Sequence, residues 1–342
     1  MIQRRHWMGG LALMPGMLCS ASLARAAAAS APSARGFDGP FVMALIAPSH
    51  TPEEARAKWR PLADKLAKRL GVAAELQVSK QYADVVKAAA SGRAHVSWLS
   101  NSSALEAVES GSAEVFATMQ VRGPDGQALT GYRAQIVVRD DSPLHSVDTL
   151  LAQAPKLSLR MGDAKSTSGY IIPFYYVFAR RGLNPATLFK SLAIGGHAEN
   201  MAAVLAGQAD ATTTNDEEVK KLAQRDPDAA RRLRVIWSSQ EIRQSPLLWS
   251  TALSPQVRSA IRETVLGFGQ TQAEQQALMD MNRIVKFVPS SNRQLLPIAD
   301  IDLFTARSTL AADTTLTAEQ KAAAEVQINR RATRLEVLLK RS

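Results

Sequence analysis

Short apolar runs that alternate with amphipathic segments dominate this chain and restrict the folds open to it. Residues 41–47 form a continuous apolar run, which is typical of a strand buried in a parallel sheet. Thr51 then opens a capping box with proline at the first helical position. This predicts a helix that Pro61 breaks or restarts and that Gly71 ends. Repeated alternation of this kind predicts an α/β fold with mixed, mostly parallel sheets.

The alternation falls into two blocks, which predicts two lobes with a cleft between them. The first block has predicted strands and helices at residues 74–78, 82–90, 95–99, 103–110, 115–121 and 132–138. The second has them at residues 157–160, 166–181, 188–193, 197–206, 210–214, 217–224, 234–237 and 247–253. We therefore expect lobe 1 at residues 39–139, lobe 2 at 140–250, a return to lobe 1 at 251–312 and a C-terminal helix at 313–342.

The N-terminus has the features of an export signal. Arg4 and Arg5 precede an apolar stretch that ends at Ala24-Arg25-Ala26. A basic head, a short apolar body and an A-x-A exit predict a cleaved signal peptide over residues 1–26 and a periplasmic location. Pro15 interrupts the stretch, which argues against a permanent span of about 20 apolar residues. Paired arginines leave the twin-arginine and general secretory routes both open. Residues 27–38 are predicted to be a flexible mature N-terminus.

Composition excludes several classes of function. The only cysteine, Cys19, lies inside the predicted signal, so the mature chain has no disulfide, thiolate nucleophile or cysteine metal site. We expect no cofactor and no metal. The net charge of +10 would suit nucleic acid, but the basic residues are scattered without an aromatic-interleaved patch, and export argues against it. A positive surface can instead attract small anions.

Three consecutive hydroxyl residues, Ser166, Thr167 and Ser168, lie between a predicted strand and a predicted helix. Hydroxyls at a helix start can simply cap the backbone. The same position offers free N–H groups and the positive end of the helix dipole, which suit a tetrahedral oxyanion. His197 follows two glycines before another helix, and it either donates to an anion or is a capping or surface histidine.

The segment from Ser166 to Pro173, STSGYIIP, with YYVFA after it, resembles the phosphonate-binding components of phosphonate ABC transporters. Further matches follow in order along the chain at residues 81–86, 131–132, 196–199, 210–217, 234–239, 246–249, 287–291 and 296–298. The resemblance covers nearly the whole mature chain. It implies a class II periplasmic-binding fold, in which two crossovers join the lobes and the ligand lies between them.

The resemblance also implies roles for individual residues. The hydroxyl cluster at residues 166–168 would cradle the phosphonate oxygens, and His197 would add a donor from the same lobe. Tyr82 and Tyr132 would contribute from the opposite lobe or the hinge, since their hydroxyls bind oxygen while their rings exclude water. Glu217 matches an acid that contacts the amino group of aminoalkylphosphonates.

Two positions depart from the family pattern. Relatives that bind aminoalkylphosphonates carry an acid within a Gly-Asp-Pro stretch, where this chain has Ser245 between Gln244 and Pro246. A serine cannot neutralise an ammonium, and an unpaired buried charge is costly. Ser100 replaces a usual glycine and narrows the cleft. The expected ligand is therefore an alkylphosphonate, phosphite or phosphate rather than 2-aminoethylphosphonate.

An enzyme is not expected, because phosphoryl transfer would need a Walker-type loop or a metal–carboxylate cluster. The acidic run at residues 216–218 suits the N-terminus of a helix better than a metal site. A Ser166 nucleophile would have only His197 as its base. The expected partner is an ABC transporter permease. The alternative is that the chain itself is a ligand-sensing subunit for a membrane signalling kinase.

The C-terminal helix begins at a capping box at residues 317–320. It carries a sparse apolar face formed by Ala324, Ile328, Leu335 and Leu338. That face either packs on its own lobe or makes a homodimer contact.

Overall fold

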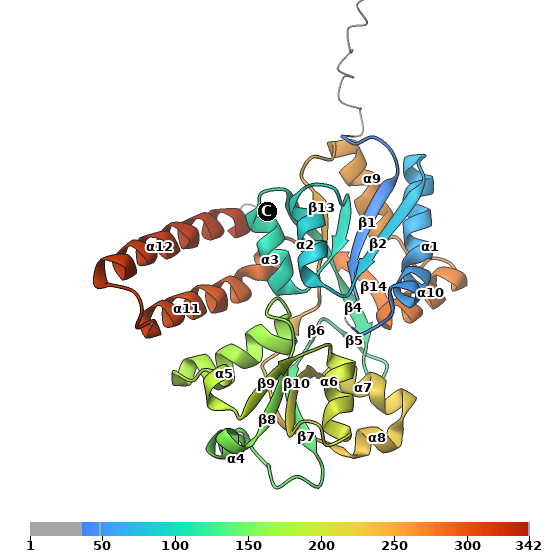
Figure 1. Ribbon diagram of the computed structural model, residues 1–342. Coiled ribbons are helices and arrows are strands. Elements are labelled where there is room, and N and C mark those ends of the chain that lie inside the picture. Colours follow the sequence, from blue (N-terminus) through green and yellow to red (C-terminus); the bar gives the residue numbers. More distant parts are fainter. Residues whose placement is uncertain (1–35, 48, 341–342) are drawn as a thin grey trace, which may run out of the picture.

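The computed structural model describes residues 36–47 and 49–340, which form two α/β lobes and a projecting helical hairpin (Figure 1). The predicted signal peptide and most of the segment at 27–38 lie outside the described residues. Phe37 lies within them, and its ring centroid is 4.0 Å from that of His95. Phe37 packs against the core of the first lobe, which therefore begins slightly before the expected residue 39.

The first lobe is built on a seven-stranded sheet in the order β14-β4-β13-β3-β1-β2, with β5 paired to β4. Its strands are β1 (Phe41–Ile46), β2 (Ala74–Ser79), β3 (Val96–Trp98), β4 (Ala113–Arg122), β5 (Ala128–Leu129), β13 (Leu247–Ser250) and β14 (Ile284–Pro289). Its helices are α1 (Pro52–Leu70), α2 (Tyr82–Ala90), α3 (Asn101–Glu109), α9 (Pro255–Leu266), α10 (Gln272–Asn282) and the short η5 (Asn292–Leu295).

The second lobe is built on a five-stranded sheet in the order β11-β7-β10-β8-β9. Its strands are β7 (Ala134–Arg139), β8 (Ser158–Met161), β9 (Ser191–Ile194), β10 (Ala211–Asn215) and β11 (Leu233–Ser238). Its helices are α4 (Val147–Gln153), η1 (Ala154–Lys156), α5 (Pro185–Leu188), α6 (His197–Leu205), α7 (Asp216–Arg225) and α8 (Pro227–Arg231). A two-stranded pair, β6 (Gly131–Tyr132) with β12 (Ile242–Arg243), joins the lobes and forms the hinge.

Five strands of the first sheet, β4-β13-β3-β1-β2, follow the same order as the five strands of the second, β11-β7-β10-β8-β9. In each, an antiparallel strand that arrives from the other lobe is inserted between two strands that run the same way: β13 between β3 and β4, and β7 between β10 and β11. The mixed α/β architecture is as predicted, but the sheets are not mostly parallel: among the described strands, four of the eleven pairings are parallel, namely β1 with β2 and β3, and β8 with β9 and β10. The predicted lobe boundaries are also wrong. Residues 134–139 belong to the second sheet and residues 247–250 to the first. An apolar strand next to a crossover has no sequence signal for the sheet that it joins.

Helix α1 corrects a second expectation, because Pro61 neither breaks nor restarts it. An interior proline costs about 3 kcal/mol, since it removes one hydrogen bond and clashes with the preceding turn. Pro61 lies on the exposed face, where water can solvate the carbonyl that loses its partner. The opposite face buries Trp59, Leu62 and Leu66 in the core, and this packing holds the helix continuous.

The predicted helix at residues 166–181 is present but is wound differently. It contains the π-helical turns Thr167–Ile171 (η2) and Phe174–Phe178 (η3), then the 3-10 turn Ala179–Arg181 (η4). Gly182 ends it in the left-handed conformation, with φ of 67°. At its start, the Gly162 N–H donates to the Gly169 carbonyl at 2.9 Å. A Cβ on Gly169 would lie 3.0 Å from the Gly162 Cα, so glycine permits this close approach.

Helices α11 (Leu296–Ala312) and α12 (Ala318–Lys340) form a hairpin that projects beside the first lobe (Figure 1). Leu335 and Leu339 of α12 are buried against the first lobe, and Ile328 packs against the same cluster. The Arg331 guanidinium donates to both oxygens of Glu109 on α3 at 2.9–3.0 Å. The apolar face of this helix therefore packs on its own lobe. Within the described part of the chain, no helix is long and apolar enough to cross a membrane.

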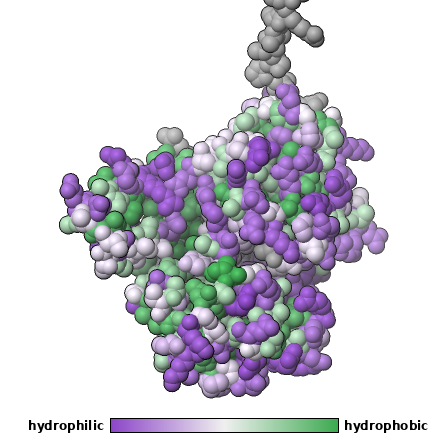
Figure 2. Space-filling model, viewed as in Figure 1, coloured by the Kyte–Doolittle hydropathy of each residue, from purple (hydrophilic) through white to green (hydrophobic). Residues whose placement is uncertain are grey.

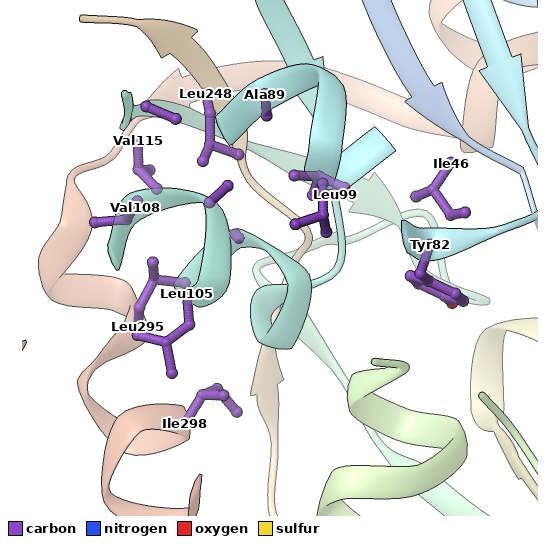
Figure 3. Packing of buried hydrophobic residues seen from close by; sticks show 14 of the residues in the cluster. Ile46, Tyr82, Ala89, Leu99, Leu105, Val108, Val115, Leu248, Leu295 and Ile298 are labelled. Carbon is purple, nitrogen blue, oxygen red and sulfur yellow. The ribbon is translucent and has the colours of Figure 1, made fainter. Parts of the chain in front are cut away.

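Packing in a buried cluster of the first lobe fixes the position of one residue at the cleft. In the first lobe, a buried cluster extends from Leu295 and Ile298 to Ile46 and Tyr82 at its far end (Figure 3). Tyr82 is thereby fixed at the edge of the lobe, where the second lobe begins. Figure 2 shows hydrophilic residues spread over both lobes and the hairpin, with hydrophobic residues interspersed among them.

Candidate ligand-binding site

A cavity of about 90 Å³ lies between the two lobes. All eight residues that the sequence nominated line it: Tyr82, Tyr132, Ser166, Thr167, Ser168, His197, Glu217 and Ser245. The other lining residues are Ile46, Trp98, Ser100, Asn215, Glu218, Lys221, Gln244 and Asn282. These residues come from both lobes and from the hinge.

The hydroxyl cluster lies at the start of the π-helical segment, and its three side chains are buried. Ser166 caps the start of this helical segment, which is one of the two roles that the sequence allowed for the cluster. Its Oγ accepts a hydrogen bond from the Gly169 N–H at 3.1 Å. Ser168 Oγ accepts from the Asn215 Nδ2 at 3.1 Å. Thr167 Oγ1 accepts from the backbone N–H of Ser102, on the opposite lobe, at 2.8 Å.

Two tyrosines face this cluster. Tyr82 is the first residue of α2, and its hydroxyl hydrogen bonds with Ser166. Tyr132 lies on the hinge strand β6, and its hydroxyl hydrogen bonds with Ser168. Burial raises the pKa of Tyr82 to about 12 and also raises the pKa of Tyr132. Both hydroxyls therefore stay neutral and able to donate.

His197 begins α6 directly after Gly196 and is buried. Its Nε2 lies 3.4 Å from the Asn215 Nδ2, so Asn215 bridges the histidine and Ser168. Burial lowers the pKa of His197, which keeps the ring neutral near pH 7. The buried groups around the hydroxyl cluster thus offer polar contacts without formal charge.

The charged residues of the cavity come from the first turns of α7. Asn215 caps this helix by accepting from the Glu218 N–H at 2.9 Å. Lys221 Nζ donates to Glu218 Oε1 at 2.8 Å. Burial opposes ionisation of Glu218, but the charge and hydrogen bond of Lys221, together with His197 and Ser49, outweigh burial and lower the pKa of Glu218 to about 2. Glu217 accepts from the Gln244 Nε2 at 2.7 Å, and burial raises the pKa of Glu217.

Hydrogen bonds close the cleft beside the cavity. Ser100 Oγ and Ser103 Oγ, at the start of α3, both donate to the Lys165 carbonyl of the second lobe, at 2.9 and 3.1 Å. The Lys165 ammonium forms an ion pair with Glu106. Ser100 lines the cavity, as the expected narrowing of the cleft requires.

Sequence reasoning missed Asn215, Glu218 and Lys221. The spacing of Lys221, three and four residues after two acids, was the signal that could have placed it on their helix face. The acidic run does begin a helix, as predicted. Among the described residues, no group of three His, Cys, Asp or Glu side chains is placed to hold a metal ion.

Two lobes that share a five-strand order, a two-stranded hinge and a polar cavity between them define the class of periplasmic substrate-binding proteins. The family model described as "ABC transporter, phosphonate, periplasmic substrate-binding protein" matches residues 44–295. The chain belongs to this family of phosphonate-transporter binding proteins.

Individual relatives agree with this assignment. The phosphonates-binding periplasmic protein of Escherichia coli K12 is 32% identical over 276 residues, which cover 76% of this chain and 80% of the relative. A binding protein component of an ABC phosphonate transporter from Pseudomonas aeruginosa superposes with a TM-score of 0.77 at 30% identity, covering 88% of this chain and 98% of that one. PhnD1 from Prochlorococcus marinus, solved with methylphosphonate, gives 0.66 at 18% identity over 76% and 96% of the two chains, and its likeness concerns the fold.

Proposed function

We propose that the eight nominated residues form the binding site for a phosphonate or related ligand, with the hydroxyl cluster, His197 and the two tyrosines on its phosphorus oxyanion, and that the closed protein delivers it to the permease of an ABC transporter. One observation carries this proposal. Residues that are far apart in the sequence, from Tyr82 to Ser245, line one cavity between the lobes. A ligand that contacts both lobes stabilises the closed form.

The chemistry of the cavity suits a tetrahedral oxyanion. Three hydroxyls, two tyrosines and a neutral histidine surround one end of it. Each phosphonate oxygen can accept several hydrogen bonds, so closely spaced hydroxyl groups match its needs. The small volume and the neutral Ser245 favour methylphosphonate, phosphite or phosphate over 2-aminoethylphosphonate.

The geometry supports binding rather than catalysis. Ser166 Oγ is engaged by the Gly169 N–H as a helix cap, and the nearest histidine, His197, has its Nε2 beside Asn215. An activated serine would need that ring within hydrogen-bond reach of its hydroxyl.

We also infer export through the predicted signal peptide and a monomer in solution. The monomer is supported by the internal packing of Leu335 and Leu339. Val326 and Val337 are exposed on the same helix, so a homodimer through it is the alternative. Light scattering at high protein concentration separates the two states.

Isothermal titration calorimetry on the mature chain tests the binding function. We expect methylphosphonate, phosphite or phosphate to bind, and Ser168→Ala to weaken binding by about tenfold, since it removes a buried polar partner. Ser259→Ala, on the exposed face of α9, is the matched control and should bind as the unaltered chain does. If no phosphorus oxyanion binds the unaltered chain, the proposal is wrong.

A further inference from the structure

The cavity between the lobes is lined by a cation that belongs to the protein. Among the described residues that line the cavity, Lys221 is the only lysine or arginine. It follows Glu217 and Glu218 by four and three residues on α7, so the three side chains share one helix face. Any substituent on the ligand's phosphorus that points toward this face of α7 meets all three.

Lys221 is fixed as a charged partner of Glu218. Its Nζ lies 2.8 Å from Glu218 Oε1, and the two side chains are 31% and 12% exposed. Burial would lower the pKa of Lys221, but the Glu218 carboxylate outweighs burial and raises it. The pair is therefore ionised in the closed protein, and the Glu218 carboxylate is not free for a second cation.

Glu217 is the remaining carboxyl group, and it already has two neighbours. Gln244 Nε2 donates to it at 2.7 Å, and the Lys221 charge acts on it across the helix turn. Ser245, next to Gln244 on the opposite wall, contributes no charge. A ligand ammonium here would share Glu217 with the ammonium of Lys221.

We propose that Lys221 is a built-in counter-ion, and that it makes the site select phosphorus oxyanions whose second substituent carries no positive charge. This inference rests on the proposed function and adds its specificity determinant. An uncharged substituent leaves the Lys221–Glu218 pair intact. A cationic one brings a second ammonium beside Lys221, where Glu217 is the only carboxyl group of the three-residue face not already paired with a lysine, and this weakens its binding relative to an uncharged substituent.

Two ligands of the same size test the effect of the substituent's charge alone. Propylphosphonate and 2-aminoethylphosphonate differ only in a terminal methyl against a terminal ammonium. In calorimetry we expect the unaltered protein to bind propylphosphonate at least about tenfold more tightly. Lys221→Met keeps the length of the side chain and removes its charge, so it should reduce that preference by about tenfold or more.

Lys220→Met is the matched control. Lys220 forms the same kind of intrahelical pair, with Asp216 at 2.6 Å, but it does not line the cavity. It should leave the preference unchanged. Ser245→Asp is an independent variant that adds a carboxylate to the opposite wall, and it should favour 2-aminoethylphosphonate even if Lys221→Met does not fold.

The outcomes separate this inference from the proposed function. Equal or tighter binding of 2-aminoethylphosphonate by the unaltered protein would overturn it, as would an unchanged preference in Lys221→Met. If methylphosphonate binds but neither longer ligand does, size sets the limit and Lys221 does not. If no phosphorus oxyanion binds, methylphosphonate included, the proposed function itself fails, and this inference fails with it.

Discussion

Removing one hydroxyl at the lobe interface should weaken ligand binding without touching the ligand. Ser103 is fully buried at the start of α3 and does not line the cavity. Its Oγ donates to the Lys165 carbonyl of the other lobe at 3.1 Å. When the lobes separate, water replaces this bond, so it stabilises the closed form specifically.

The size of the effect follows from the contact. A net hydrogen bond contributes about 0.5–1.5 kcal/mol. In Ser103→Ala the Lys165 carbonyl keeps its bond from Ser100, so no polar group is left without a partner across the cleft. We therefore expect a loss of about 1 kcal/mol in closure, which raises the dissociation constant about fivefold.

Calorimetry with methylphosphonate measures the dissociation constant, and small-angle scattering measures how far the lobes close at saturation. Urea denaturation of the ligand-free protein is the control, because a closure contact should affect it little. An unchanged dissociation constant would refute the reasoning. So would a loss of affinity accompanied by an equal loss of stability in the ligand-free protein.

Three further perturbations have defined outcomes. Asn215→Asp keeps the oxygen that caps α7 but cannot donate to Ser168, so calorimetry should show weaker anion binding while urea denaturation shows stability within about 1 kcal/mol. Buried His197 has a pKa below 6.5 in the folded state, so the unfolded chain binds more protons as pH falls below 6.5. The free energy of unfolding should therefore decrease as the pH is lowered through that range, and it should decrease less steeply in His197→Gln. An equal slope in the two proteins would contradict the assignment. Leu335→Ala should cost about 2–4 kcal/mol in urea denaturation, whereas the exposed Val337→Ala should cost less than about 0.5.

Much of the fold could be predicted because strands and helix starts have local signals. The apolar run at residues 41–47 and the capping box at Thr51 both depend on neighbouring residues only, and both are present in the structure. The lobe boundaries could not be predicted in the same way. Residues 134–139 are apolar in either sheet, and only pairing with β10 and β11 decides their lobe.

The residues of the candidate site also differ in whether they have a local sequence signal. Three consecutive hydroxyl residues before an apolar segment indicate a helix start, so the sequence could nominate Ser166, Thr167 and Ser168. Lys221 looks like one of many charged residues on a helix surface. Only the fold, which turns that face of α7 toward Tyr132 and Gln244, places it in the cavity.

The inserted strands also determine the order in which the chain can assemble. The five strands of the second sheet come from one continuous stretch, residues 134–238. The first sheet needs β13 between β3 and β4, and β13 is synthesised only after the whole second lobe. Until then β3 and β4 present unpaired edges, which are prone to pair with other chains. The second lobe can therefore fold while the chain emerges, whereas the N-terminal lobe must wait for residues 247–250, and a fragment that ends before them should aggregate.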